Sequence, residues 1–205
     1  MLLAIDTSAG TSVAVVDRDA GILSEHSEAD TRRHAEVIGS LIQKALKDAG
    51  VPVTDLSGVA IGMGPGPFTG LRVGIAAARA FAFGIGRPVV PVVSHDAIAF
   101  GRTEPTLVVT DARRREVYWS AYTGTDDAGL PIRVDGPGLV RPEALDAAVG
   151  NASAYLRLDA AVVSAASIGL VAELLYAHGR PFASGEALYL RSPDVTLSHG
   201  PKRVS

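Results

Sequence analysis

The sequence contains no cysteine among its 205 residues. Disulfides and thiolate metal sites are therefore excluded, and the composition fits a reducing cytosol. Basic residues are not in excess either, because 19 lysines and arginines stand against 22 aspartates and glutamates and give a net charge of -3. Without a basic footprint, this chain alone is a poor candidate for nucleic-acid binding.

Long apolar segments are also missing. No uninterrupted apolar run approaches the ~20 residues that cross a membrane, and Asp6 interrupts the N-terminal run too early for a signal peptide. We therefore expect a soluble, cytoplasmic protein. The chain is 47% hydrophobic and 20% charged, which is typical of a globular protein. Its length allows one large domain or two of roughly 100 residues each.

Glycine and proline are concentrated at one place, where residues 62–70 contain four glycines and two prolines. This stretch follows a short apolar run, 59–61, and precedes an alanine-rich segment, 75–83, which predicts a strand, a tight loop and a helix. Two functions are open: a phosphate cradle at the helix start, or a rigid corner that presents a small-residue helix to a partner. The missing Walker A ending and the two prolines, which lack backbone donors, favour the corner.

Apolar periodicity predicts a mixed α/β unit in the first half of the chain. The expected order is β-β-β-α-β-α-β, in segments 2–5, 12–16, 22–26, 32–49, 58–62, 70–84 and 88–94. Thr31 is the predicted N-cap of the first helix and Gly50 its C′ residue. A short helix ending at Phe100 and a polar boundary at 101–105 should follow.

The second half begins with a similar pattern. Strands 106–110 and 116–122 flank a turn that opens with Asp111, as the first two strands flank a turn that opens with Asp6. This repetition indicates two related halves. A loop-like segment with room for one short strand and two helices should follow, at 123–141, 142–149 and 165–178. The predicted organisation is an N-terminal subdomain, a smaller C-terminal one and a flexible tail, at 1–101, 102–191 and 192–205.

The two aspartate-led turns are candidate nucleotide sites. Asp6 with Thr7 and Ser8 could position a metal-bound nucleotide, or could form an Asx-type turn that serves the fold. The second turn, 111–115, has no glycine, so its side chains should obstruct the close approach of a phosphate. Its arginines could contact a nucleic-acid phosphate or could line a solvated turn.

Metal and hydrolase chemistry lack support in the sequence. A helical metal pair would need a second histidine four residues after His34, and that position is Ile38. His34 is therefore expected to be an interface or capping residue. A Gly-x-Ser-x-Gly nucleophile elbow is also missing from the sequence.

Five motifs in this order resemble the bacterial TsaB (YeaZ) family. They are Ile5-Asp6-Thr7-Ser8, Arg33-His34-Ala35-Glu36, Gly64-Pro65-Gly66-Pro67-Phe68-Thr69-Gly70-Leu71-Arg72-Val73-Gly74, Asp111-Ala112-Arg113-Arg114 with Glu116-Val117-Tyr118, and Leu188-Tyr189-Leu190-Arg191. The resemblance covers residues 1 to about 122 and resumes near 186. The glycine-rich motif is specific to the family.

The resemblance implies two ribonuclease-H-like subdomains of the actin-like ATPase and sugar-kinase class, with the second reduced. It also implies a required, non-catalytic subunit of the complex that makes threonylcarbamoyladenosine in tRNAs decoding codons that begin with A. TsaD, the expected partner, transfers threonylcarbamoyl onto N6 of the adenosine next to the anticodon, and the ATPase TsaE should dock as well. The first two helices would pack on TsaD as a four-helix bundle.

Site residues follow from the resemblance and from the helical pattern. The expected partner-binding face consists of His34, Val37, Ile38, Leu41, Phe68, Leu71, Arg72 and Ile75. Asp6, Thr7 and Ser8 would form a vestigial nucleotide turn, and Arg113 and Arg114 are candidate tRNA contacts. We expect no metal, and no cofactor bound by this chain alone, with ATP used by the complex. The isolated chain is expected to form a homodimer.

Two enzymatic alternatives remain to be weighed against this hypothesis. A small-molecule kinase of the actin-like class could use Asp6 to organise its metal, although the glycine-free turn at 111–115 disfavours a phosphate clamp. A peptidase would need a metal pair or a nucleophile constellation, and neither is present in the sequence. A self-associating structural protein could use the same two helices.

Overall fold

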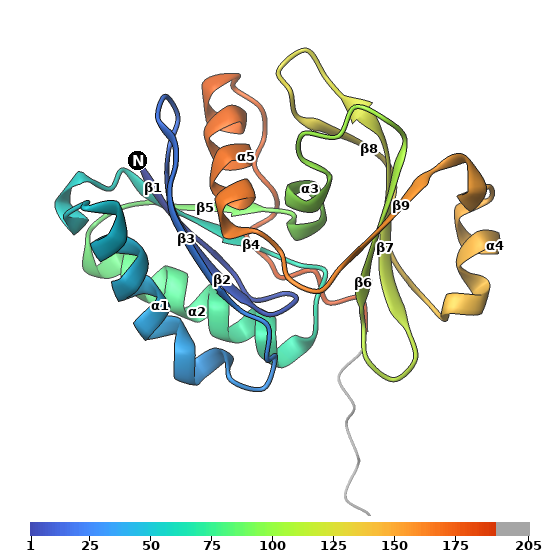
Figure 1. Ribbon diagram of the computed structural model, residues 1–205, viewed down its shortest axis with the longest axis horizontal. Helices are drawn as coiled ribbons and strands as arrows, with labels where there is room; N and C mark the ends of the chain where they lie inside the picture. The colour runs from blue at the N-terminus through green and yellow to red at the C-terminus, as the bar shows by residue number, and fades with distance from the viewer. Residues whose placement is uncertain (192–205) are drawn as a thin grey trace, which may run out of the picture.

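Two β-sheets organise the chain, one in each half of the molecule (Figure 1). The computed structural model describes residues 1–191. The first sheet has the order β3-β2-β1-β4-β5, formed by Gly21–Glu28, Thr11–Asp17, Leu2–Asp6, Gly58–Gly62 and Val89–Val92. The second has the order β8-β7-β6-β9, formed by Pro131–Val140, Val117–Thr125, Thr106–Asp111 and Leu156–Ala160.

Both sheets contain the same three-strand unit. β1 pairs antiparallel with β2 and parallel with β4, and β6 pairs antiparallel with β7 and parallel with β9. The mixed sheets and the doubled strand-turn-strand pattern predicted from the sequence are therefore confirmed.

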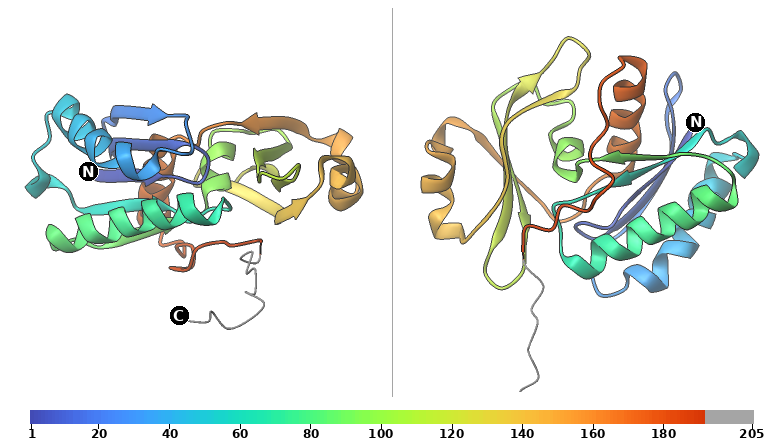
Figure 2. Two further views of the ribbon diagram at one scale, coloured as in Figure 1. Left: turned by 90° about the horizontal axis from the view of Figure 1, so that it is seen from below. Right: turned by 180° about the vertical axis from the view of Figure 1, so that it is seen from behind.

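The helices make the first half a three-layer unit. α1 (His34–Ala49) and α2 (Phe68–Gly84) lie side by side on one face of the first sheet, and α5 (Ala165–Ala177) covers the other face (Figures 1 and 2). The short helices are α3 (Ser94–Ala99) and α4 (Leu145–Val149). Because β1 is buried on both faces, its Leu3 and Ile5 pack towards α1 and α2, whereas Leu2 and Ala4 pack towards α5.

Helix boundaries differ slightly from the prediction. α1 begins at His34 with Arg33 as N-cap, so the expected start at residue 32 and the Thr31 cap were wrong. The turn before it is held by Asp30, whose carboxylate accepts a hydrogen bond from the Arg32 amide at 3.0 Å. Gly50 has the left-handed φ of 65° expected at the C′ position.

The expected loop at 123–141 contains a ten-residue strand, β8. Glycine and proline usually mark the end of a strand, and here they lie within one that has several register shifts against β7. Gly138 is required because a Cβ there would overlap the indole of Trp119. The edge strand β9 was also not predicted.

After α5 the chain stays with the first sheet. The Ala183 amide donates to Pro91 O at 3.2 Å, and the Leu188 amide donates to Met63 O at 2.8 Å. The segment after α5 thus runs along the first sheet, and it also reaches the second half, where Arg180 pairs with Asp126 and Arg191 with Glu116. The predicted tail, 192–205, lies outside the described residues. Across residues 1–191, no helix combines the length and the apolar character needed to cross a membrane.

Candidate functional site

The turn after β1 is closed around the carboxylate of Asp6, which is 1% exposed. Asp6 Oδ1 accepts hydrogen bonds from the amide and the hydroxyl of Ser8, both at 2.7 Å, and Oδ2 accepts one from the Ser94 hydroxyl at 2.6 Å. Burial raises the pKa of Asp6, and the hydrogen bonds from Ser8 and Ser94 oppose that rise. Both carboxylate oxygens of Asp6 are thus bonded within the chain, as expected if Asp6 forms an Asx-type turn that stabilises the fold.

The glycine-rich loop packs directly against this turn. A Cβ on Gly62 would overlap Asp6 Oδ2, and one on Gly74 would overlap Thr7 Oγ1. A Cβ on Gly66 would lie 2.8 Å from Ser8 Cα. The glycines are therefore needed for the close approach of the loop to residues 6–8. This packing fits the rigid corner better than the phosphate cradle.

Four of the eight residues predicted for the partner face are buried inside this chain. His34 and Ile38 are 7% exposed, Leu71 is fully buried and Ile75 is 8% exposed. Because α1 and α2 lie flat on the sheet, their apolar stripe covers the chain's own core. The prediction that these four side chains form the surface is corrected: they support the two helices from beneath.

His34 is a buried structural residue at the start of α1. Its Nδ1 lies 2.8 Å from the Thr11 hydroxyl of β2. Burial, and secondarily the nearby Arg113, lowers the pKa of this imidazole. The residue thus ties α1 to β2.

The outward surface of the two helices combines small side chains with charged and long polar ones, such as Glu36, Lys44 and Arg79. We call it the outer α1–α2 face; its exposed members include Ala35, Gly39, Ser40, Thr69, Arg72, Ala76, Ala80 and Phe83. Phe83 is the most exposed of the large hydrophobic residues in the described part of the chain, at 90%. Val37 and Leu41 are half-buried. The alanine-rich sequence predicted the small residues, but Phe83 was missed because the apolar pattern does not tell which face an aromatic residue occupies.

Three side chains stack on one another at the N-terminal end of α2. The Arg72 guanidinium lies 3.7 Å from the centre of the Phe68 ring, and the Phe68 and Tyr189 rings are 4.9 Å apart at 43°. Tyr189 comes from the segment after α5. Phe68 and Arg72 are therefore exposed but held in place by a cation–π contact and a ring contact.

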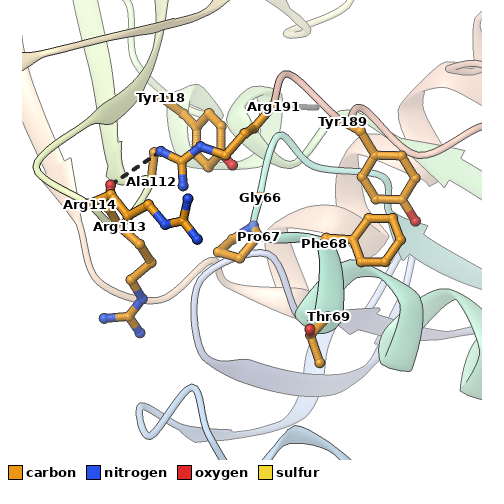
Figure 3. Close-up of a pocket in the computed structure, with 10 residues that line it drawn as sticks. All are labelled: Gly66, Pro67, Phe68, Thr69, Ala112, Arg113, Arg114, Tyr118, Tyr189 and Arg191. Atoms are coloured by element: carbon orange, nitrogen blue, oxygen red, sulfur yellow. Dashed lines mark hydrogen bonds between the residues drawn. The ribbon is translucent and has the colours of Figure 1, made fainter. Parts of the chain in front are cut away.

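The second aspartate-led turn faces this stack across a pocket of about 420 Å³. Arg113, Arg114 and Arg115 all have positive φ, at 64°, 53° and 61°. Figure 3 shows the Phe68 and Tyr189 rings on one side of the pocket and the guanidinium groups, with Tyr118 beside them, on the other. The structure thus brings together Phe68 and Arg113, which the sequence analysis assigned to different functions. The Leu188–Arg191 motif was the only sequence signal that the last segment reaches this place.

Buried polar side chains join α3 to the second sheet. His95 is fully buried, with Nδ1 2.8 Å from the Ser120 hydroxyl and Nε2 3.0 Å from the Thr110 hydroxyl. Burial and the neighbouring Arg133 lower its pKa to about 3, so the imidazole is neutral. Among residues 1–191, no cluster of three or more histidine or carboxylate side chains is placed to hold a metal ion.

A family model described as TsaD, tRNA N6-adenosine threonylcarbamoyltransferase, matches residues 16–131. The Escherichia coli K12 protein named tRNA threonylcarbamoyladenosine biosynthesis protein TsaB is 33% identical over 147 residues, which are 69% of this chain and 63% of that protein. The chain belongs to the TsaB (YeaZ) family. An uncharacterised protein of Mycobacterium tuberculosis is 40% identical over 95% of this chain and 93% of its own length.

Solved structures extend the similarity over both sheets. YeaZ from Pseudomonas aeruginosa is 28% identical, with a TM-score of 0.75 over 92% of this chain and 99% of that chain. Together with the mixed sheets, this similarity assigns the TsaB-family chain to the α/β fold of the actin-like class.

Proposed function

We propose that this chain takes part in tRNA threonylcarbamoyladenosine biosynthesis as a non-catalytic subunit that binds and activates a TsaD-type transferase. The names of its relatives support the pathway. The observation that supports the binding role is the outer α1–α2 face, where the 90% exposed Phe83 lies on the same helix as the exposed Ala76 and Ala80. The catalytic partner would transfer threonylcarbamoyl onto N6 of the adenosine next to the anticodon.

The outer α1–α2 face has the composition of a helix-packing surface. Small residues such as Gly39, Ala76 and Ala80 allow two helix pairs to approach closely, as a four-helix bundle requires. Phe83 would then enter a pocket of the partner, and burying such a side chain contributes about 1.5–3 kcal/mol. Phe68 and Arg72 lie at the other end of α2 and would extend the contact. The buried His34, Ile38, Leu71 and Ile75 hold the two helices in place for it.

The hydrogen bonding of the Asp6 carboxylate supports a non-catalytic role for this chain. A carboxylate that organises a metal's water shell needs free lone pairs, and both oxygens of Asp6 accept short hydrogen bonds from the chain itself. The same observation disfavours a small-molecule kinase that uses Asp6. We therefore propose that this chain alone binds no ATP and that the ATP is used by the complex, with TsaE as a further subunit.

The same surface should drive self-association when the partner is absent. An exposed apolar side chain such as that of Phe83 pairs with a second copy as readily as with a related subunit. We propose a homodimer of the isolated chain, in competition with the heterodimer.

Co-purification with the TsaD homologue of the same organism tests this proposal. Phe83→Glu should abolish the complex, because the charge would have to be buried in the contact. Leu156→Glu is the matched control, since Leu156 is an exposed hydrophobic residue (54%) on the edge strand β9 of the other sheet. Leu41→Glu should also abolish the complex, but Leu41 packs against the core and that variant needs a folding check. An intact complex with Phe83→Glu would refute the proposed face.

A further inference from the structure

The pocket between the start of α2 and the turn at 111–115 has two chemically distinct sides. Phe68 and Tyr189 form an aromatic side, and Arg113, Arg114 and Arg191 form a cationic side (Figure 3). Pro67 lies between them, and the Tyr118 side chain also lines the pocket. A volume of about 420 Å³ is large enough for a nucleotide-sized group.

The arginines retain hydrogen-bonding capacity for a ligand. Arg113 donates to the Thr31 hydroxyl and forms an ion pair with Asp111 at 3.2 Å. Arg191 forms an ion pair with Glu116. A guanidinium has five N–H donors, so each of these contacts leaves others for a phosphate. The carboxylates of Asp111 and Glu116 offset part of the positive charge of this side, which therefore suits one phosphodiester better than a triphosphate.

The backbone of the turn at 111–115 has an unusual conformation at its three arginines. Arg113, Arg114 and Arg115 occupy the left-handed region, which non-glycine residues enter rarely. The turn is held by the Arg113 amide, which donates to Asp111 Oδ1 at 2.8 Å, and by the Glu116 amide, which donates to Arg113 O at 3.0 Å. Strained backbone that the surrounding structure maintains is common at functional sites.

We propose that this pocket binds one unpaired nucleotide of an RNA. The phosphodiester would pair with Arg113, Arg114 and Arg191, and the base would stack on Tyr189, whose ring is supported by Phe68. RNA is recognised in this way at loops and ends, where unpaired bases stack on aromatic rings. The inference rests on the proposed function and deepens it, because it gives this chain a direct contact with the tRNA.

Fluorescence anisotropy with a labelled tRNA anticodon stem-loop tests the inference, using the full chain alone and the complex with the TsaD homologue. Arg113→Asn combined with Arg114→Asn removes both charges with a residue that tolerates positive φ. We expect at least tenfold weaker binding and a salt dependence that is smaller by about 0.7 in slope, since the site holds one phosphate and each phosphate contact on a single strand contributes about 0.7. Tyr189→Leu should weaken binding about 5- to 150-fold through lost stacking.

The matched control is Arg18→Asn combined with Arg157→Asn. Each of these arginines also pairs with a neighbouring carboxylate, Asp19 or Asp159, and lies away from the pocket. The control should bind RNA within twofold of the wild-type chain.

Co-purification separates this inference from the proposed function. The pocket variants should retain the TsaD homologue, whereas Phe83→Glu should lose it. Equal RNA affinity of the pocket variant and the control would overturn the inference and leave the proposed function intact, as would failure of both the chain and the complex to bind RNA. If AMP displaces the RNA at equal concentration, the pocket is a mononucleotide site and the RNA proposal is wrong.

Discussion

The two aspartate-led turns differ sharply, although each follows the central strand of a similar sheet unit. Asp6 is 1% exposed and its oxygens are bonded to Ser8 and Ser94, whereas Asp111 is exposed and pairs with Arg113. Glycines of the loop at 62–74 pack against the first turn, whereas three arginines form part of the second turn itself. The same strand-turn-strand unit thus supports the fold in one half and presents charge to solvent in the other.

This difference originates in what packs on each turn. The loop at residues 62–74 places glycines against residues 6–8, so the first turn is covered by backbone. At the second turn the neighbouring segment contributes Arg191, which pairs with Glu116, and an open pocket remains. Gly62→Ala and Arg115→Gly test how far this contrast holds, and a pH experiment on His95 tests the contact of α3 with the second sheet.

Gly62→Ala should be the most damaging substitution at the enclosed turn. The new Cβ would overlap Asp6 Oδ2 and lie 2.6 Å from Ser94 Oγ, and neither atom can move without breaking their buried hydrogen bond. Overpacking together with a lost buried hydrogen bond should lower the free energy of unfolding by about 3 kcal/mol or more. Urea denaturation measures this loss.

Gly39→Ala is the matched control for that experiment. Gly39 lies inside α1, and within the described residues no atom comes within 4 Å of a Cβ built there. Alanine is the better helix former, so the free energy of unfolding should rise by about 0.5–1 kcal/mol. Similar losses for the two glycine variants would show that the first turn is not specifically enclosed.

The buried His95, which joins α3 to the second sheet, should make the free energy of unfolding fall in acid. His95 has its pKa lowered to about 3 in the folded state, whereas the unfolded residue titrates near its ordinary value of 6.5. The unfolded state therefore binds the proton first, and stability is lost as pH falls from about 6.5 to about 3. At pH 5 the loss from this one group should be about 2 kcal/mol.

Other buried groups modify this pH dependence. The lowered pKa of His34 adds to the acid loss, whereas the raised pKa values of Asp6 and Asp96 favour the folded state as pH falls. His95→Asn isolates the imidazole, because it keeps a polar side chain without the titration. Urea denaturation at pH 7 and pH 5 should show a smaller acid loss in the variant; an unchanged loss would contradict the assignment to His95.

Sequence reasoning succeeded where one segment determines its own structure. The alanine-rich run before Gly84 and the alternation at 117–122 gave α2 and β7 with small boundary errors. The strand-turn-strand pattern predicted the two turns, and the family resemblance gave the fold. These features depend on local periodicity and on motifs that are continuous in the chain.

Features that depend on distant segments were missed or misassigned. Ile38 and Leu71 have the spacing of an interface, but the chain's own sheet covers them. The pocket at residues 66–69 needs Tyr189 and Arg191, which are more than 100 residues away in the sequence. No periodicity links such segments, so only the packed structure shows which polar and apolar groups meet.

Arg115→Gly should give the smallest effect and the opposite sign at the exposed turn. Arg115 has φ of 61°, which glycine adopts without the steric penalty that a Cβ brings. We expect a gain of about 0.5–1 kcal/mol in the free energy of unfolding, because relief of the left-handed strain exceeds the added entropy of the unfolded chain. Arg18→Gly is the matched control, since Arg18 is outside the positive-φ residues in the described part of the chain and its replacement should not stabilise. A loss in Arg115→Gly similar to that of the control would mean that the arginine side chain itself holds the second turn, and the contrast between a turn fixed by glycines and a turn strained by arginines would no longer hold.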